Sequence, residues 1–375
     1  MIMTVDVPGF TADLIGVGAS HDRLTDPNRH GDADARPGLI DFAVNVRPGP
    51  PPFLVEALTS RIADLAAYPS DADTVKATAR AAELHGRHES DVLLLAGAAE
   101  GFELVARLGF SHAALIQPSF TEPERVLAAA GTRVTHVTPP PPWRLSDAQV
   151  PEDADLVVVG NPTNPTSVLH PAADILALRR PGRTILVDEA FADLTLDDDT
   201  LEPESVARIA GDDLIVVRSV TKTFGLAGLR AGYLLASPRT IEAMTVGRRH
   251  WPLGTLTLTA LHACLSDAGQ RYAHDQARIV AADRAHLVTR LREIGLHPLA
   301  PPRAPYVLLS APRALDLKDA LRERGFAVRS CANFVGLGSD HLRLAVRPEN
   351  LTDALISAMQ DVRDRSVQPG ETSNR

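Results

Sequence analysis

The sequence predicts an α/β fold in which a seven-stranded sheet is covered by helices on both faces. Between residues 91 and 237 the chain repeats one pattern, a short apolar run, a loop rich in Gly, Pro, Asn or Ser, and a stretch of helix formers. This pattern is typical of βα units. Because the runs are apolar on both faces, the sheet is expected between two helical layers. The runs are Val92–Ala96, Ala113–Ile116, Val134–Val137, Leu156–Val159, Thr184–Val187, Leu214–Val217 and Gly232–Ala236.

Beyond residue 237 the pattern changes to long helices and then to short strands mixed with helices, which predicts a smaller α+β domain. The expected helices are Thr255–Leu265, Tyr272–Ile294, Leu315–Arg324 and Leu351–Val362, and the expected strands are Tyr306–Leu309, Ala327–Arg329 and Leu342–Val346. We therefore expect an N-terminal arm over residues 1–50, with a strand-like run at Ile40–Val44, a large domain over 51–270, a small domain over 271–365 and a disordered tail over 366–375.

Composition excludes several classes of protein. The 375 residues are 45% hydrophobic and 23% charged, which predicts a soluble chain with a large core. A net charge of −9, spread along the chain, leaves no basic stripe for nucleic acid. Cys264 and Cys331 are too few for a disulfide scaffold and too far apart for a metal motif, so we expect free thiols in a reducing cytoplasm. No signal peptide and no run of about 18 apolar residues is present, so we expect no membrane span.

Lysine chemistry has few candidates in this chain. Of 38 basic residues only three are lysines, Lys76, Lys222 and Lys318. Lys222 follows the run Leu214–Val217 and lies among small and apolar residues, where desolvation favours a neutral amine that is able to form a Schiff base. The alternative is an ordinary surface lysine on a loop. Lys76 and Lys318 occur in amphipathic helices beside charged residues, so we expect both on solvated faces.

Polar residues also follow two successive expected strands, at the ends where ligand sites of such sheets lie. Asp188 comes directly after Thr184–Val187, and a carboxylate there needs a cation or hydrogen-bond donors. The protonated pyridine nitrogen of pyridoxal phosphate is one such cation; a helix N-cap or a magnesium ligand are alternatives. Asn164 lies in a loop with two Asn-Pro steps after Leu156–Val159, which points its amide into the crevice or only shapes a turn.

Small residues at the end of Val92–Ala96 predict an anion site. Ala98 and Ala99 open a helix after Gly97, so their amides are available to a phosphate. The glycines do not have the G-x-G-x-x-G spacing, which disfavours a dinucleotide-binding dehydrogenase. Phe120 follows Ala113–Ile116, where its ring either stacks on a flat cofactor or packs in the core.

Taken together, these residues resemble those of the class I/II aminotransferase superfamily, the fold-type-I pyridoxal phosphate enzymes, from about His30 to Val362. The resemblance rests on Asn164-Pro165-Thr166, Asp188-Glu189-Ala190, and Ser219-x-Thr221-Lys222 followed by Gly228-Leu229-Arg230. It implies an aspartate-aminotransferase-like fold with a mostly parallel sheet, and pyridoxal 5'-phosphate as cofactor. Lys222 would form the Schiff base and shuttle protons, Asp188 would pair with the pyridine nitrogen, Asn164 would bind the phenolic oxygen, and Phe120 would stack on the ring.

The resemblance also implies how the cofactor phosphate is held. The amides of Ala98 and Ala99 with Ser219 and Arg230 would bind it. Tyr68, in Tyr68-Pro69, matches a tyrosine that the partner subunit contributes, which implies a homodimer with shared active sites; the alternative is a half-buried surface tyrosine.

Two positions depart from the family pattern. Ser167 replaces the usual glycine after Asn164-Pro165-Thr166. Phe191 stands where many relatives carry a tyrosine whose hydroxyl bonds the phenolic oxygen of the cofactor. Asn164 is therefore expected to be the main partner of that oxygen.

Looser motifs resemble two members of the superfamily, threonine-phosphate decarboxylase of corrinoid (cobalamin) synthesis and histidinol-phosphate aminotransferase. They are His30-Gly31, Asp41-Phe42-Ala43-Val44-Asn45, the segment from Val328 to Leu337, and Leu342-Arg343-Leu344-Ala345-Val346-Arg347. The pattern makes Arg343 the fork for the substrate carboxylate. Arg329 and His30 become candidates for a substrate phosphate, and Asn45 lines the same entrance. In so arginine-rich a chain, the alternative for Arg329 is a surface charge.

We therefore expect an enzyme acting on a small, phosphorylated amino acid. Decarboxylation and transamination share every cofactor contact and differ in which bond at the substrate Cα stands perpendicular to the ring. Decarboxylation of threonine phosphate is narrowly favoured, and transamination of the histidinol-phosphate type to a 2-oxo acid is the alternative. A non-catalytic binding protein would lack Lys222 or Asp188, and both are present.

Overall fold

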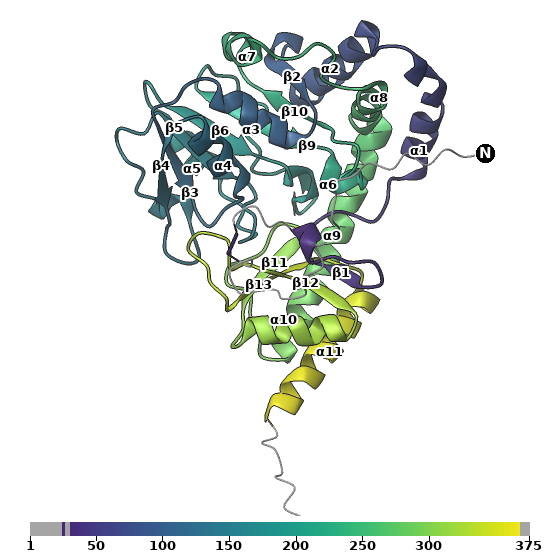
Figure 1. Ribbon diagram of the computed structural model, residues 1–375, viewed down its shortest axis with the longest axis vertical. Coiled ribbons are helices and arrows are strands. Elements are labelled where there is room, and N and C mark those ends of the chain that lie inside the picture. Colours follow the sequence, from purple (N-terminus) through teal and green to yellow (C-terminus); the bar gives the residue numbers. More distant parts are fainter. Residues whose placement is uncertain (1–24, 27–30, 368–375) are drawn as a thin grey trace, which may run out of the picture.

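The computed structural model describes residues 25–26 and 31–367 and contains the predicted α/β sheet (Figure 1). Its seven strands have the order β2-β10-β9-β6-β5-β3-β4, and only β10 runs antiparallel to its neighbours. The expected fold class is thereby confirmed, with strand ends that differ by one or two residues. The strands are β2 Val92–Leu95, β3 His112–Ile116, β4 Arg133–Val137, β5 Leu156–Gly160, β6 Thr184–Asp188, β9 Leu214–Ser219 and β10 Gly232–Leu235.

Alternating side chains of the strands enter two separate cores, one on each face of the sheet. In β9, Val216 packs into one core and Val217 into the other. The first core includes residues of α1 Pro52–Thr59, α2 Asp71–His85, α5 Ala172–Ala177 and α8 Thr255–Cys264. The second includes residues of α3 Ala98–Ala106, α4 Glu122–Ala129 and α7 Pro238–Thr245. Burial from both sides explains why the strand sequences are continuously apolar.

One strand does not fit the expectation of two buried faces. In β4, Arg133 and His136 are exposed. The strand lies at the edge of the sheet, where it has a neighbour on one side only. Charged side chains on an edge strand also discourage pairing with another chain.

A second, smaller sheet brings the two ends of the described chain together. Its strand order is β1-β12-β13-β11, with β1 from the N-terminal arm parallel to β12. The strands are β1 Ile40–Phe42, β11 Tyr306–Ser310, β12 Phe326–Ser330 and β13 His341–Ala345, and α10 Ala314–Glu323 and α11 Glu349–Val367 pack against them. Because α11 reaches Val367, residues 366 and 367 are helical rather than part of a tail; residues 368–375 lie outside the described residues.

The long helix α9, Asp267–Glu293, runs from the large sheet to the small one (Figure 1). It begins five residues before the expected start, with the Ser266 hydroxyl as its N-cap, accepting from the Gly269 amide. Gly269 hides this start in the sequence, but a Cβ there would lie 2.0 Å from the Cys264 carbonyl oxygen, so close packing on α8 requires glycine. The division at residue 270 falls inside α9, and the domain bounds stay a proposal.

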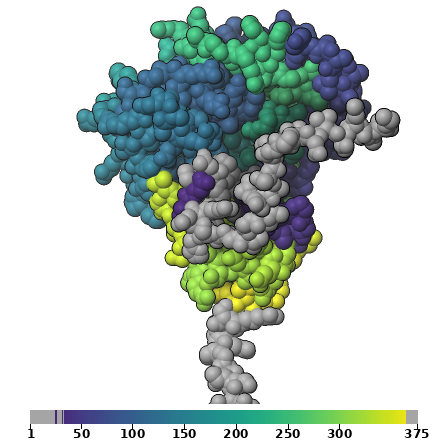
Figure 2. All heavy atoms as spheres, in the orientation of Figure 1, coloured from purple at the N-terminus to yellow at the C-terminus, as the bar shows by residue number. Residues whose placement is uncertain are grey.

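Figure 2 shows the same face with all heavy atoms, the yellow-green small-sheet elements below the large-sheet elements. The remaining elements are short: α6 Thr221–Phe224, strands β7 Leu196–Asp197 and β8 Thr200–Leu201, and 3-10 turns η2 Gly31–Ala33, η3 Ile62–Ala66, η4 Glu89–Asp91, η5 Leu145–Asp147 and η6 Ala192–Leu194. Among the helices of the described ranges, none has the length and apolar character that crossing a membrane requires.

Candidate active site

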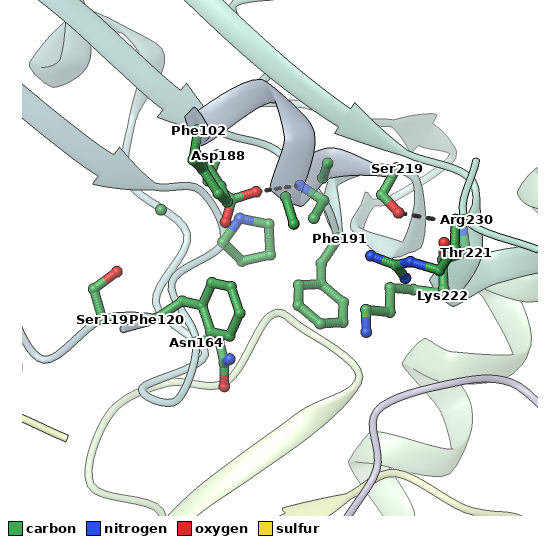
Figure 3. Close-up of a pocket in the computed structure, with 15 residues that line it drawn as sticks. Phe102, Ser119, Phe120, Asn164, Asp188, Phe191, Ser219, Thr221, Lys222 and Arg230 are labelled. Atoms are coloured by element: carbon green, nitrogen blue, oxygen red, sulfur yellow. Dashed lines mark hydrogen bonds between the residues drawn. The ribbon is translucent and has the colours of Figure 1, made fainter. Parts of the chain in front are cut away.

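A pocket opens where the strands β3, β5, β6 and β9 end, as expected for this type of sheet (Figure 3). Its wall contains eight of the nine residues that the sequence predicted for the cofactor: Ala98, Ala99, Phe120, Asn164, Asp188, Ser219, Lys222 and Arg230. Phe191 and Thr221 also line it. The ninth residue, Tyr68, is not part of this wall.

Asp188, the last residue of β6, presents a carboxylate inside the pocket. Its Oδ1 accepts a hydrogen bond from the Ala190 amide at 3.1 Å. Desolvation raises the pKa of this carboxyl to about 6. Within the described part of the chain no cationic side chain forms a salt bridge with it. A ligand that brings a cationic N–H group to Asp188 would remove this cost of burial.

Lys222 lies in the short helix α6 that follows β9, and its backbone contacts the segment that follows β1. Its carbonyl accepts from the Arg47 amide at 2.9 Å. A Cβ on Gly225 would lie 2.4 Å from the carbonyl oxygen of Gly49, so the loop after Lys222 packs directly on the segment that follows β1. The Lys222 Nζ lies 5.6 Å from the centre of the Phe191 ring. The sequence did not predict these contacts, because residues 47–49 and 222–225 are far apart in the chain.

The turn before α3 forms a cradle that only glycines allow. Gly97 has a φ of +85°, and a Cβ there would lie 2.9 Å from a guanidinium nitrogen of Arg230. A Cβ on Gly232 would lie 3.0 Å from the amide nitrogen of Ala98. Arg230 therefore sits against the N-terminus of α3, and no salt bridge joins it to another described residue. The amides of Ala98 and Ala99, the Ser219 hydroxyl and Arg230 together suit an anion.

Glu100 and Arg248 hold this cradle and were missed by the sequence analysis. The Glu100 carboxylate accepts from the Ala96 amide at 2.6 Å and from Arg248 Nε at 2.9 Å. A glutamate in the first turn of a helix that bonds back to a preceding amide resembles a capping box, and that spacing was the signal available in the sequence.

On the far wall, Arg343 of β13 binds Asn164 of the large-sheet part. Arg343 Nη1 donates to Asn164 Oδ1 at 2.6 Å, and Nη2 donates to the Ala43 carbonyl at 2.5 Å. With its amide oxygen turned toward the guanidinium, Asn45 accepts from Nε at 3.2 Å. Burial lowers the pKa of Arg343 to about 10, so the group stays charged at neutral pH.

These partners are neutral, and no carboxylate in the described ranges forms a salt bridge with Arg343. A substrate carboxylate would supply the missing charge. Because the Asn164 oxygen is bound to Arg343, its NH2 group is the part that remains to donate to a ligand.

Arg329 belongs to a buried charge cluster. Its Nη2 donates to Asn333 Oδ1 at 2.8 Å, and its Nη1 lies 3.5 Å from Asp34 Oδ2. Lys318 Nζ lies 3.0 Å from the other oxygen of Asp34. Arg329 is 2% exposed and Lys318 8%, so neither the surface-charge alternative for Arg329 nor the solvated face expected for Lys318 is correct. Asp34 comes from the N-terminal arm, which the helical pattern around Lys318 does not reveal.

Arg329 and Arg343, with Asn45, line a second cavity, which shares Asn164 and Lys222 with the wall of the first pocket. The structure therefore brings three of the four predicted substrate residues together. The fourth, His30, lies outside the described residues. Tyr68 is 74% exposed and stacks on Trp251, with ring centres 4.2 Å apart.

The chain belongs to the class I and II aminotransferase family, whose sequence profile matches residues 37–359. It is 50% identical to the histidinol-phosphate aminotransferase of Mycobacterium bovis over 85% of this chain and 87% of that protein. It is 30% identical to the threonine-phosphate decarboxylase of Salmonella typhimurium over 86% and 91% of the two chains. In structure it is similar to the histidinol-phosphate aminotransferase of Sinorhizobium meliloti in complex with pyridoxal-5'-phosphate, with a TM-score of 0.77 and 21% identity over 93% and 100% of the chains.

Pyridoxal 5'-phosphate, the cofactor predicted from the sequence, is the cofactor of this family. The pocket fits it. The glycine cradle with Arg230 accepts a phosphate, buried Asp188 suits a protonated ring nitrogen, and Lys222 supplies an amine.

Proposed function

We propose that this chain is an aminotransferase that moves the amino group of a small, phosphorylated amino compound of the histidinol-phosphate type to a 2-oxo acid. The observation that carries the proposal is the 50% identity to a relative of that name over 85% of the chain, against 30% for the decarboxylase. The comparisons therefore favour the alternative of the sequence analysis over its preferred reaction.

In this proposal the residues of the pocket have separate tasks. When bound, pyridoxal phosphate withdraws electrons from the substrate Cα so that one bond there breaks. The Lys222 amine would take up the proton that leaves the substrate Cα and would release it to the carbon that keeps the amino group. Asp188 holds a proton at the ring nitrogen, and the Asn164 NH2 group orients the ring oxygen. Arg343 would bind the carboxylate of the 2-oxo acid and of the amino acid formed from it, and its position relative to Asn164 would set which bond at the Cα of that acid stands perpendicular to the ring.

The far end of the pocket would bind the substrate phosphate through Arg329. Lys318 contributes indirectly, because its ion pair with Asp34 offsets the negative charge that faces Arg329. We expect Lys318→Met to raise KM for a phosphorylated amino donor about tenfold, while KM for an unphosphorylated 2-oxo acid stays within twofold. Steady-state kinetics with both substrates measure this. Lys318→Arg, which keeps the charge, is the matched control, and an equal rise for both substrates would contradict the role.

Decarboxylation of threonine phosphate is the second candidate, supported by the 30% identity to that enzyme over 86% of the chain. One experiment separates the two. Purified holoenzyme is given histidinol phosphate with 2-oxoglutarate, or threonine phosphate alone, while glutamate formation, carbon dioxide release and cofactor absorbance are followed. Glutamate without carbon dioxide supports the aminotransferase. Carbon dioxide from threonine phosphate, with no need for an oxo acid, would replace it with the decarboxylase.

We further propose that the enzyme acts as a cytoplasmic homodimer with shared active sites. Both cysteines are buried and free, which suits a reducing compartment. Tyr68 stacks on Trp251, which is 55% exposed, and other exposed apolar side chains lie near them in the sequence, Ile62 and Leu65 before Tyr68 and Val246 before Trp251. Exposed apolar side chains of this kind on a single chain support a subunit interface. In it, Tyr68 would reach the phosphate of the partner's site.

Mixed dimers test the shared site. Tyr68→Phe should lose about tenfold in activity, because a hydrogen bond to a charged group contributes about 1.5–3 kcal/mol. Lys222→Ala subunits should be inactive. After the two variants are mixed and allowed to exchange subunits, activity should rise to about a quarter of that of the wild type, because half of the dimers then hold one intact site. Activity equal to the average of the two parents would count against a shared site.

A further inference from the structure

Ser167 is the residue at which this chain departs from the glycine usual in its family, and it has an unusual backbone. Its φ is +66°, a conformation that side chains other than glycine rarely adopt, and it is fully buried. A serine kept in such a conformation costs stability unless its side chain makes compensating contacts.

The Ser167 hydroxyl makes contacts that a glycine lacks. Its Oγ accepts from the Arg303 amide at 3.1 Å and from the Ala304 amide at 2.9 Å. The Ser167 carbonyl also accepts from the Arg303 amide, at 2.9 Å. Ser167 lies in the loop after β5 of the large sheet, whereas residues 303 and 304 lead into β11 of the small sheet. The hydroxyl therefore joins the two parts of the molecule.

From Ala304 a chain of contacts returns to Asn164, three residues before Ser167. Ala304 packs in one cluster with Phe191 and Tyr306. The Tyr306 ring lies edge-on to Phe191 at 5.1 Å and carries the Arg343 guanidinium at 5.5 Å from its centre. Arg343 then donates to Asn164. The contacts form a closed ring, in which the Ser167 hydroxyl and the Asn164–Arg343 hydrogen bond are side-chain polar links across the boundary.

We propose that Ser167 is a positioning residue, whose hydroxyl fixes the distance between Asn164 and Arg343. Two links hold a loop in place more firmly than one, because each bond lowers the entropy cost of forming the other. The distance between Asn164 and Arg343 would in turn set where the Asn164 NH2 group meets the cofactor and where Arg343 meets the substrate. This role is independent of which amino compound the enzyme uses.

The test compares Ser167→Ala with Ser167→Gly in the holoenzyme. Both variants lose the hydroxyl, but only the glycine variant also relieves the backbone strain. The first readout is hydrogen exchange of the Ala304 amide, which donates to the Ser167 hydroxyl and which we expect to exchange about tenfold faster in both variants. The Arg303 amide keeps the Ser167 carbonyl as an acceptor and should change less. The second is the pH midpoint of the visible absorbance of the bound cofactor, which should rise by about half a unit to one unit in both when the Asn164 donor loosens.

Ser266→Ala is the matched control, because it removes a hydroxyl that accepts a backbone amide at the N-terminus of α9, away from the pocket. It should change neither readout. Three outcomes would overturn the proposal: a shift in the glycine variant alone, which is a backbone effect; faster exchange with an unchanged absorbance midpoint; and the same shifts in Ser266→Ala, which would reflect general loss of stability.

Discussion

Replacing Lys222 by alanine is expected to abolish turnover, by about 10⁴-fold or more, together with the visible absorbance of the covalently bound cofactor. Lys222 is the lysine at the pocket, and the sequence contains only two others. Lys222 lines the pocket that contains Asp188 and the phosphate cradle, whereas Lys76 is exposed and Lys318 is paired with Asp34. No other lysine of the sequence is available to take its place. Absorbance spectra and single-turnover assays of the purified variant measure both effects.

Lys76→Ala is the control for this experiment. It removes the same side chain from the exposed face of α2, so full activity and full absorbance are expected. Circular dichroism and thermal unfolding establish that the Lys222 variant is folded. Substantial activity in a folded Lys222→Ala protein would exclude the proposed chemistry for this pocket.

Asp188→Asn is expected to retain the cofactor and to lose about 10²- to 10³-fold in rate, the range for removal of one preorganised electrostatic partner. The remaining contacts to the phosphate and through Lys222 explain retention. An amide in place of the carboxylate no longer holds a proton on the ring nitrogen, so electron withdrawal from the substrate weakens. Cofactor content measured by absorbance, and kcat measured on the same sample, separate binding from rate.

The pH dependence of stability gives a readout of Asp188 that needs no substrate. Burial raises the pKa of Asp188 to about 6 in the folded apoprotein, against an ordinary value of 3.8. The folded state then binds more protons than the unfolded state between these values, so stability falls as the pH rises through this window. The amide introduced by Asp188→Asn does not titrate, so the apoprotein of the variant should gain stability relative to the wild type as the pH rises through the same window.

Asp316→Asn, on the exposed face of α10, should show neither the rate loss nor this relative gain. An unchanged kcat in Asp188→Asn would contradict the proposed pairing with the ring nitrogen. If the difference in stability between the Asp188→Asn and wild-type apoproteins did not change with pH, the raised pKa of Asp188 would be contradicted, and with it the argument that this buried carboxylate suits a cation.

The sequence by itself determined the class of fold and predicted eight of the residues that line the pocket. Apart from the edge strand β4, each large-sheet strand is built on a continuous apolar run, a local pattern that burial on both faces imposes. Since ligand sites lie at the carboxyl ends of such strands, Asp188 directly after one run and Lys222 five residues after the next were candidate site residues from their place in the chain, and the family resemblance supplied their roles. The predicted start of α9 was too late because Gly269 interrupts the helical pattern. This glycine is required by the close packing of α9 on α8.

Only the tertiary structure decided which of these residues touch. Three sets of contacts join segments that are distant in sequence. They are the Asn164–Arg343 bond, the Asp34–Lys318–Arg329 cluster and the contacts of Ser167 to residues 303 and 304. Lys318 shows why periodicity misled, because a helical pattern predicts which face is polar but not whether an acidic residue from the N-terminal arm covers it. Such pairings depend on how two sheets pack across α9, and the energy of a buried charge or strained backbone depends on the partner that this packing supplies.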